Sequence, residues 1–82
     1  MRFMVSFRPK PGCRAQLQEA APAELAHASA MREAGILHEL FVSEPGHAWL
    51  VLAADDRTEV DRLLGDFPMY PYVETTVDPL IN

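Results

Sequence analysis

Apolar and polar residues alternate along the first segment of the chain. Within Arg2–Phe7 one face carries Phe3, Val5 and Phe7, and the other carries Arg2, Met4 and Ser6. A period of two residues is typical of a β-strand with one buried face, so we predict a strand here. The next five residues, 8–12, contain two prolines and a glycine and are predicted to form a loop.

The longer segment from Arg14 to Ala34 is rich in Ala, Leu, Glu and Gln, which favour a helix. Proline is tolerated in a first turn but not in a helix interior. Because Pro22 interrupts this segment, we expect a short leading turn and then a main helix, Pro22–Ala34, that stops at Gly35. The side of the helix that should face a sheet, with Glu24 within or beside it, is marked by Leu17, Ala20, Ala21, Ala28 and Met31.

The middle of the chain predicts a β-hairpin. Two apolar runs, Ile36–Ser43 and His47–Ala54, are joined by the turn sequence Glu44-Pro45-Gly46. Each run is long enough for one strand.

A second helix and a last strand follow. Asp56 with Glu59 three residues later resembles a capping box. The amphipathic spacing i, i+3, i+4, i+7 then predicts a helix over Arg57–Asp66, which Pro68 ends. Residues Tyr72–Val77 alternate again and should form the final strand.

The resulting order β-α-β-β-α-β predicts an α+β fold of ferredoxin-like type, as a single domain over residues 1–82. Its four-stranded antiparallel sheet carries both helices on one face and leaves the other face bare. Several residues expected on that face are apolar, and a chain of 82 residues buries only a modest core. We therefore expect a second copy to cover it, in a homodimer or higher homo-oligomer.

Composition narrows the classes of protein to which the chain can belong. Hydrophobic residues make up 49% and charged residues 23%, as in globular rather than disordered proteins. A net charge of −5 argues against nucleic acid or an anionic membrane as a partner. We find no apolar run typical of a signal peptide or membrane span, so we expect a cytoplasmic protein. The sequence has a single cysteine, Cys13, so we expect no internal disulfide. No Cys or His residues have the spacing of zinc ligands, so we expect no metal site.

Four segments then resemble one known family: Met31-Arg32-Glu33-Ala34-Gly35, Pro45-Gly46-His47, Asp66-Phe67-Pro68-Met69-Tyr70-Pro71-Tyr72 and Val77-Asp78-Pro79-Leu80. They are similar to the muconolactone isomerase family, whose members show a helix ending in R-E-G, a G-H turn and a segment of the type L-P-L-F-P-Y. The resemblance covers roughly residues 24–80 and is most specific in the last third. It implies a dimeric α/β barrel and cofactor-free proton transfer on a small ring compound. The Ala-rich first helix and aliphatic hairpin depart from the family pattern, so we expect a larger or more apolar substrate.

Two residues of the main helix are the first catalytic candidates. Glu24 and His27 lie three apart and project from one face. A carboxylate partly withdrawn from water rises in pKa, and a neighbouring imidazole can share its proton, which suits enolisation next to a carbonyl. The alternative is that both are ordinary solvated side chains at the helix flank.

Tyr70 and Tyr72 could donate a hydrogen bond to an enolate oxygen, or could instead fix their loop and a subunit contact. Arg8, with Lys10 nearby, could bind a substrate carboxylate, although charges at a strand end are more often solvated. Cys13 next to Arg14 carries no nucleophile–base arrangement, so we assign it no role.

Three residues of the hairpin could line a substrate pocket: His38, Phe41 and Trp49. Strand parity puts His38 with Leu40 on one face and Glu39 with Phe41 on the other. His38 could equally be a half-buried or interface residue, and a lone tryptophan in a strand is more often core. His47 is expected to be an exposed turn residue.

Two main functional hypotheses result. The first is a cofactor-free isomerase or cyclase that transfers protons on a small hydrophobic carbonyl or lactone compound in a catabolic or natural-product pathway. The second is a non-catalytic module that binds a ligand or pairs subunits. A cofactor-independent or haem-dependent monooxygenase on the same fold is a weaker third, since architecture does not dictate chemistry.

Overall fold

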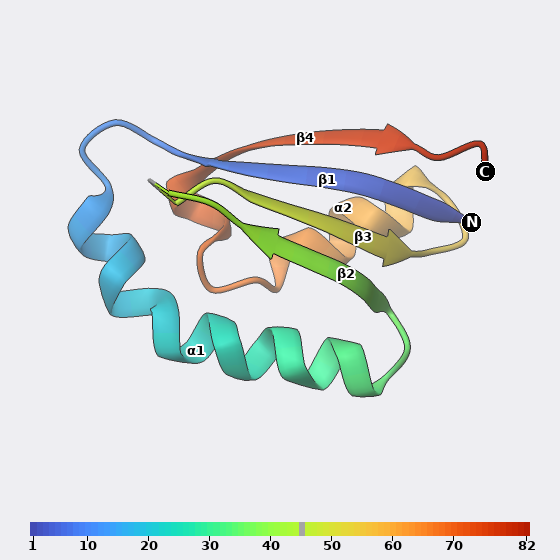
Figure 1. Ribbon diagram of the computed structural model, residues 1–82, viewed down its shortest axis with the longest axis horizontal. Helices are drawn as coiled ribbons and strands as arrows, with labels where there is room; N and C mark the ends of the chain where they lie inside the picture. The colour runs from blue at the N-terminus through green and yellow to red at the C-terminus, as the bar shows by residue number, and fades with distance from the viewer. Residues whose placement is uncertain (45) are drawn as a thin grey trace.

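The computed structural model describes residues 1–44 and 46–82 and contains the six predicted elements in the predicted order, with one extra short helix. They are β1 (Arg2–Pro9), α1 (Arg14–Glu33), β2 (Leu37–Val42), β3 (Ala48–Ala53), α2 (Arg57–Gly65), the 3₁₀ helix η1 (Tyr70–Tyr72) and β4 (Val73–Pro79). Figure 1 shows the four strands side by side with α1 along one edge and α2 behind them. The predicted turn at residues 44–46 includes Pro45, which lies outside the described residues.

The sheet has the strand order β2-β3-β1-β4, and every neighbouring pair is antiparallel. The predicted ferredoxin-like architecture is therefore confirmed. Several strand ends differ from the prediction by one or two residues, and β4 reaches Pro79. β1 continues through Arg8 and Pro9, which pair with Glu74 and Val73, and Tyr72 belongs to η1 instead of the last strand.

Alternation in β1 determines which face is buried. Phe3, Val5 and Phe7 are 2%, 0% and 3% exposed, and they form one core with residues of α1, α2 and the other strands. The residues of that core are Phe3, Val5, Phe7, Ala28, Met31, Leu37, Leu50, Leu52, Ala54, Val60, Leu63, Leu64, Phe67 and Val73. Both helices therefore cover the same face of the sheet.

The second helix begins as its sequence predicts. The Asp56 side chain accepts a hydrogen bond from the Glu59 backbone N–H at 2.9 Å, and Glu59 Oε1 accepts one from the Asp55 N–H at 2.9 Å. The first bond satisfies a backbone donor that the first turn of a helix leaves free, and the second holds the residue that precedes the N-cap. Asp56 is confirmed as the N-cap, while the Glu59 side chain accepts from Asp55 instead of from Asp56 as in a standard capping box.

The prediction for the first helix is wrong in one respect. α1 is a single helix from Arg14 to Glu33 with Pro22 in its interior. Pro22 is exposed, so the backbone carbonyl that loses its intrahelical partner can turn to water, and the helix bends instead of ending. Figure 1 shows the N-terminal part of α1 running in a different direction from the rest.

The second strand contains an irregularity that changes its faces. Leu37 pairs with Leu52 and Glu39 with Val51, so two steps on β2 match one step on β3. His38 is the extra, unpaired residue of a β-bulge. It is exposed, with Nε2 3.1 Å from the Gly35 carbonyl oxygen, and does not share a face with Leu40. The parity prediction for His38 is therefore wrong.

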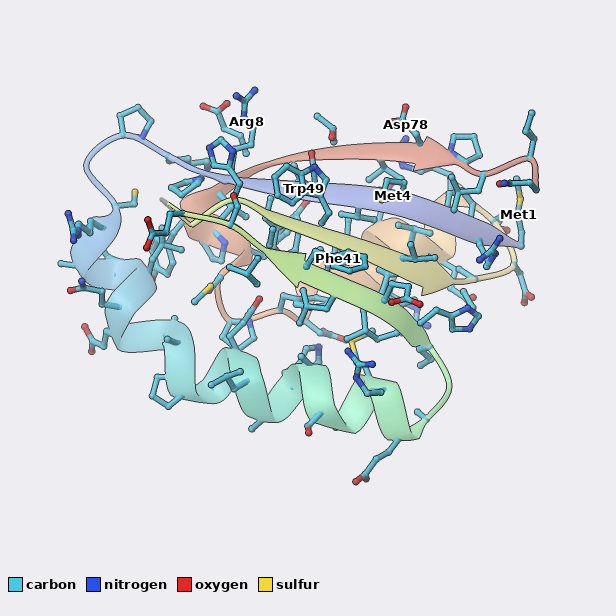
Figure 2. All side chains as sticks on the ribbon, in the orientation of Figure 1. Met1, Met4, Arg8, Phe41, Trp49 and Asp78 are labelled. Atoms are coloured by element: carbon cyan, nitrogen blue, oxygen red, sulfur yellow. The ribbon has the colours of Figure 1, made fainter. Side chains whose placement is uncertain are left out.

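The sheet face away from the helices carries apolar side chains. Phe41 and Trp49 are cross-strand neighbours on it and are 60% and 39% exposed, with Met4 on the adjoining strand. Figure 2 shows Met4, Phe41 and Trp49 on the face of the sheet turned toward the viewer. Trp49 is thus not a core residue, contrary to the more common role of a lone tryptophan. We call this surface the open face.

Candidate active site

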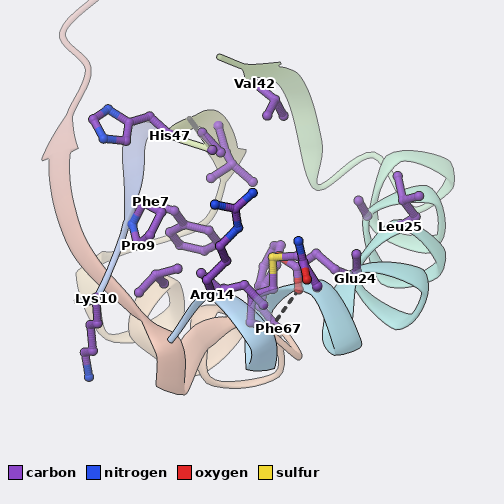
Figure 3. Close-up of a pocket in the computed structure, with 18 of the residues that line it drawn as sticks. Phe7, Pro9, Lys10, Arg14, Glu24, Leu25, Val42, His47 and Phe67 are labelled. Atoms are coloured by element: carbon purple, nitrogen blue, oxygen red, sulfur yellow. Dashed lines mark hydrogen bonds between the residues drawn. The ribbon is translucent and has the colours of Figure 1, made fainter. Parts of the chain in front are cut away.

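A cavity of about 950 Å³ lies between the first half of α1 and the helix-covered face of the sheet. Its walls come from the end of β1, from α1, from the β2–β3 hairpin and from the segment that follows α2 (Figure 3). Most of the lining is apolar, and the side chains that define its shape are Phe7, Leu17, Leu25, Ala28, Leu40, Val42, Leu50, Phe67, Met69 and Val73. The size and apolar character are those of a small-molecule site.

The cavity exists because only one half of α1 packs closely against the sheet. The C-terminal half of the helix packs through Ala28 and Met31, which are 8% and 5% exposed. The N-terminal half, beyond the bend at Pro22, presents Leu17 and Ala21 to the cavity, and both are only half-buried. The core closes under one end of the helix and leaves a pocket under the other.

Glu24 is the carboxylate that reaches this pocket. Its Oε1 accepts a hydrogen bond from the backbone N–H of Met69 at 3.0 Å, which joins α1 to the segment after α2 (Figure 3). Burial raises the pKa of the Glu24 carboxyl, while the Met69 N–H and the positive charge of His27 act in the opposite direction. A half-buried carboxyl with a raised pKa in an apolar pocket is a stronger base than an exposed one once ionised, which suits it to accept and return a proton.

His27 lies behind this pocket and does not line it. Its ring packs edge-on against Phe67, with centroids 4.7 Å apart and planes at 79°. Phe67, 2% exposed, also packs edge-on against Phe7 at 5.5 Å. The sequence placed Glu24 and His27 on one helix face, and in the structure only Glu24 faces the cavity.

Arg14 is a pocket residue that the sequence did not single out. It begins α1, and Figure 3 shows its side chain extending toward the middle of the cavity. Within residues 1–44 and 46–82, the ion pairs are Arg57–Asp61 and Glu59–Arg62, both on α2, so Arg14 has no carboxylate partner there. Helical spacing could have identified it from the sequence. Arg14 precedes Leu17 by three residues and Ala21 by seven, so the three lie on the same side of α1.

Lys10 also borders the cavity, but its charge is directed elsewhere. Its Nζ donates to the carbonyl oxygen of Pro71 at 3.1 Å, and Figure 3 shows the side chain pointing away from the pocket. His47 contributes to the lining, while its ring lies against Trp49 with centroids 6.1 Å apart. It is half-buried, not an exposed turn residue.

The other predicted site residues lie outside this cavity. Tyr70 is 37% exposed, and Tyr72 lines a separate cavity of about 260 Å³ beside α1. The turn of η1 directs these two side chains away from the pocket that Glu24 borders. Arg8, Phe41 and Trp49 do not line the pocket either, because they are on the strand positions opposite the buried face.

Among residues 1–44 and 46–82, no three His, Cys, Asp or Glu side chains gather closely enough to hold a metal ion. Within the same part of the chain, no helix has the length and apolar character needed to cross a bilayer.

Several proteins of known structure superpose on this chain. The crystal structure of a muconolactone isomerase superposes with a TM-score of 0.81 at 20% identity, covering 100% of this chain and 90% of that one. A 5-chloro-2-hydroxyhydroquinone dehydrochlorinase from Burkholderia phenoliruptrix AC1100, in complex with 2,5-dihydroxybenzoquinone, gives 0.78 at 16% identity, covering 98% and 93%. An antibiotic biosynthesis monooxygenase gives 0.64 at 16% identity, covering 99% and 96%. At these identities the superpositions establish a shared fold.

A search of curated proteins by sequence finds no significant match. The family profile for muconolactone delta-isomerase, however, matches residues 1–82. The resemblance seen in four short segments of the sequence thus extends over the whole length given. The chain belongs to the muconolactone delta-isomerase family.

Proposed function

We propose that this protein is an isomerase that transfers a proton on a small, mostly apolar carbonyl or lactone compound, with Glu24 as the base. The observation that carries the proposal is the Glu24 carboxyl in the wall of an apolar cavity of about 950 Å³, held by the Met69 N–H at 3.0 Å. Such a cavity fits a ring compound of modest size. The structurally similar proteins, a muconolactone isomerase and a 5-chloro-2-hydroxyhydroquinone dehydrochlorinase, support a small ring compound as substrate.

In the proposed step, ionised Glu24 removes a proton from the carbon next to the substrate carbonyl. The C–H bond breaks, its electron pair moves into the conjugated system, and negative charge forms on the carbonyl oxygen as an enolate. The Glu24 carboxylic acid then returns the proton to another carbon of the same system, so the double bond moves and the enzyme is restored. No other reactant is consumed, and the proposal includes no cofactor.

Arg14 is the group that we assign to the negative charge. Its guanidinium extends toward the cavity and has no carboxylate partner in the described part of the chain. A fixed positive charge that extends into the cavity can stabilise a forming oxyanion by direct contact. Arg14 thereby takes the role that the sequence analysis gave to Tyr70 or Tyr72, and Glu24 is chosen as the base over His27.

The proposal includes self-association. The open face carries Phe41 and Trp49 well exposed, with Met4 beside them, and a second copy of the sheet would cover these side chains. In solution the particle should therefore have at least twice the chain mass of 9.2 kDa. We further propose that the protein acts in the cytoplasm.

Incubation of the purified protein with muconolactone and related unsaturated lactones in deuterated water tests the reaction. Proton NMR should show deuterium entering the carbon next to the carbonyl, or a displaced double bond, faster than in buffer. The Glu24→Gln variant, which keeps the shape of the side chain, should lose this activity. Exchange at the buffer rate with every compound would overturn the enzyme proposal and leave a non-catalytic module.

A further inference from the structure

The cavity that carries Glu24 reaches the protein surface between α1 and the edge strand β2. Leu25 of α1 and Val42 of β2 both line the cavity, and they are 70% and 69% exposed. Figure 3 shows both residues on the side of the cavity away from Lys10. A single exposed apolar residue is normal on a protein surface. Here two of them, from different elements, border the same cavity, and we call this pair the mouth.

The mouth continues the apolar wall of the cavity. On the sheet side, Leu40 pairs with Leu50, and Val42 lies two residues beyond Leu40, so it is on the same face. On the helix side, Leu25 precedes Ala28 by three residues, so these two are neighbours on α1. Leu50 and Ala28 are 2% and 8% exposed, so exposure rises along both sides toward the mouth. An apolar surface therefore runs from the core to the solvent.

The groups assigned to the reaction fix only one part of a substrate. Glu24 is held by the Met69 N–H at 3.0 Å, and Figure 3 shows Arg14 extending toward the middle of the cavity. A reacting carbonyl compound has to approach both side chains. The cavity volume of about 950 Å³ is near the upper end of the roughly 300–1,000 Å³ that is typical of small-molecule sites. A single small ring beside Glu24 and Arg14 would leave part of this volume unfilled.

We propose that the substrate carries an apolar substituent, such as an alkyl chain, that passes between Leu25 and Val42 while its carbonyl-bearing ring faces Glu24 and Arg14. This inference rests on the proposed function, because it places the ring at the proposed base. Covering apolar surface is favourable in proportion to its area. Leu25 and Val42 are thus specificity-determining residues that select substituted over unsubstituted lactones and take no part in proton transfer.

A second copy of the chain is the competing occupant of the mouth. The open face, to which we assign the subunit contact, is on the other side of the sheet. Val42 pairs with Ala48, and Ala48 pairs with Phe7, which is 3% exposed under the helices, so all three are on the helix-covered face. A partner docked on the open face therefore leaves the mouth accessible to a substrate.

Amide-shift titrations of ¹⁵N-labelled protein test the proposal without requiring turnover. The ligands are an unsubstituted butenolide and its γ-butyl and γ-hexyl derivatives, and the Met69 amide reports binding in the cavity. A double variant, Leu25→Gln with Val42→Thr, makes the mouth polar with residues that suit a helix and a strand. Ile81→Thr is the matched control, because Ile81 is fully exposed and does not line the cavity.

In the wild type, Kd should fall about two- to fourfold for each methylene group that the mouth covers. The Leu25 and Val42 amides should shift when the substituted lactones bind. The double variant should lose most of the gain in affinity from butenolide to hexyl derivative, and Ile81→Thr should keep it.

An equal gain in all three proteins, or Met69 shifts that do not depend on chain length, would overturn the proposal without affecting the assignment of Glu24. A double variant that keeps the gain but has a lower particle mass by light scattering would also overturn it, because the mouth would then be a subunit contact. The predicted dependence on chain length without deuterium exchange would support the mouth and refute the proposed proton transfer. No Met69 shift with any lactone would overturn both.

Discussion

Replacing Glu24 by Gln changes one charge while nearly preserving shape. The Gln side-chain oxygen can still accept the Met69 N–H that Glu24 Oε1 holds at 3.0 Å. What disappears is the group that can take up and return a proton. A positioned general base contributes typically 10²–10⁴-fold to rate, so the isomerisation rate should fall by about that factor with little change in substrate affinity.

A companion variant, Glu24→Ala, measures how much the hydrogen bond between Glu24 and Met69 contributes to stability. It removes the acceptor and leaves the partly buried Met69 N–H unpaired. An unpaired buried donor costs about 1–3 kcal/mol, and partial exposure places this one near 1 kcal/mol. In a domain of this size that corresponds to a fall in Tm of roughly 4–8 °C. Thermal unfolding should show the fall in Glu24→Ala and not in Glu24→Gln.

The pH dependence of stability tests the direction in which folding shifts the pKa of Glu24. Because burial raises the folded-state pKa of Glu24 above its ordinary value of 4.5, the folded state binds the proton more tightly than the unfolded chain. The stability that this group contributes is therefore fully present below pH 4.5 and is lost as the pH rises through the folded-state pKa. Glu24→Gln does not titrate, so the wild type should lose stability relative to it over that window.

Urea unfolding midpoints measured from pH 4 to pH 8 check this difference, with Glu33→Gln as a matched control at an exposed position of the same helix. The control should follow the wild type throughout. A difference between wild type and Glu24→Gln that stayed constant or grew in favour of the wild type with rising pH would refute the assignment of Glu24 as a destabilised, buried carboxyl.

Further predictions concern the pocket and the open face. Arg14→Leu should raise KM and lower kcat for lactone isomerisation while leaving Tm unchanged, and unaltered kinetics would contradict its role. Phe67→Ala, at a position 2% exposed, should lower the free energy of unfolding by about 3–5 kcal/mol in urea titrations. Trp49→Glu should shift the particle toward a single 9.2 kDa chain by light scattering, and an unchanged mass would exclude the open face as the subunit contact.

Local patterns in the sequence predicted the fold well. The alternation of Phe3, Val5 and Phe7 matches a face that is almost fully buried. The Asp56–Glu59 spacing places Asp56 as the N-cap that accepts the Glu59 N–H, and Glu59 accepts the N–H of the neighbouring Asp55. Such features depend on neighbours a few residues apart, which is the range that periodicity and capping rules describe.

The errors have a different origin. Pro22 was expected to begin a helix, but packing on either side and exposure of the proline let α1 continue through it. The bulge at His38 inverts strand parity, and nothing in an apolar run marks where an extra residue will fall. In both cases contacts between distant residues determine the local structure. Patterns in a single sequence do not contain information on such contacts.

The candidate site was only partly predictable for the same reason. Glu24 could be recognised from its place on the apolar stripe of the helix. The Met69 N–H that binds it comes from 45 residues away, and Arg14 becomes a pocket residue only because α1 lies against the hairpin. Contacts between distant segments define this site.

A titration of ¹⁵N-labelled protein with muconolactone, followed by amide chemical shifts, tests the central claim that the cavity under α1 is the binding site. Binding in this cavity should produce saturable shifts at the Met69 amide and at its neighbours in the cavity wall, with the Trp49 indole signal unmoved. Shifts confined to Phe41, Trp49 and the rest of the open face, with Met69 unaffected, would contradict it.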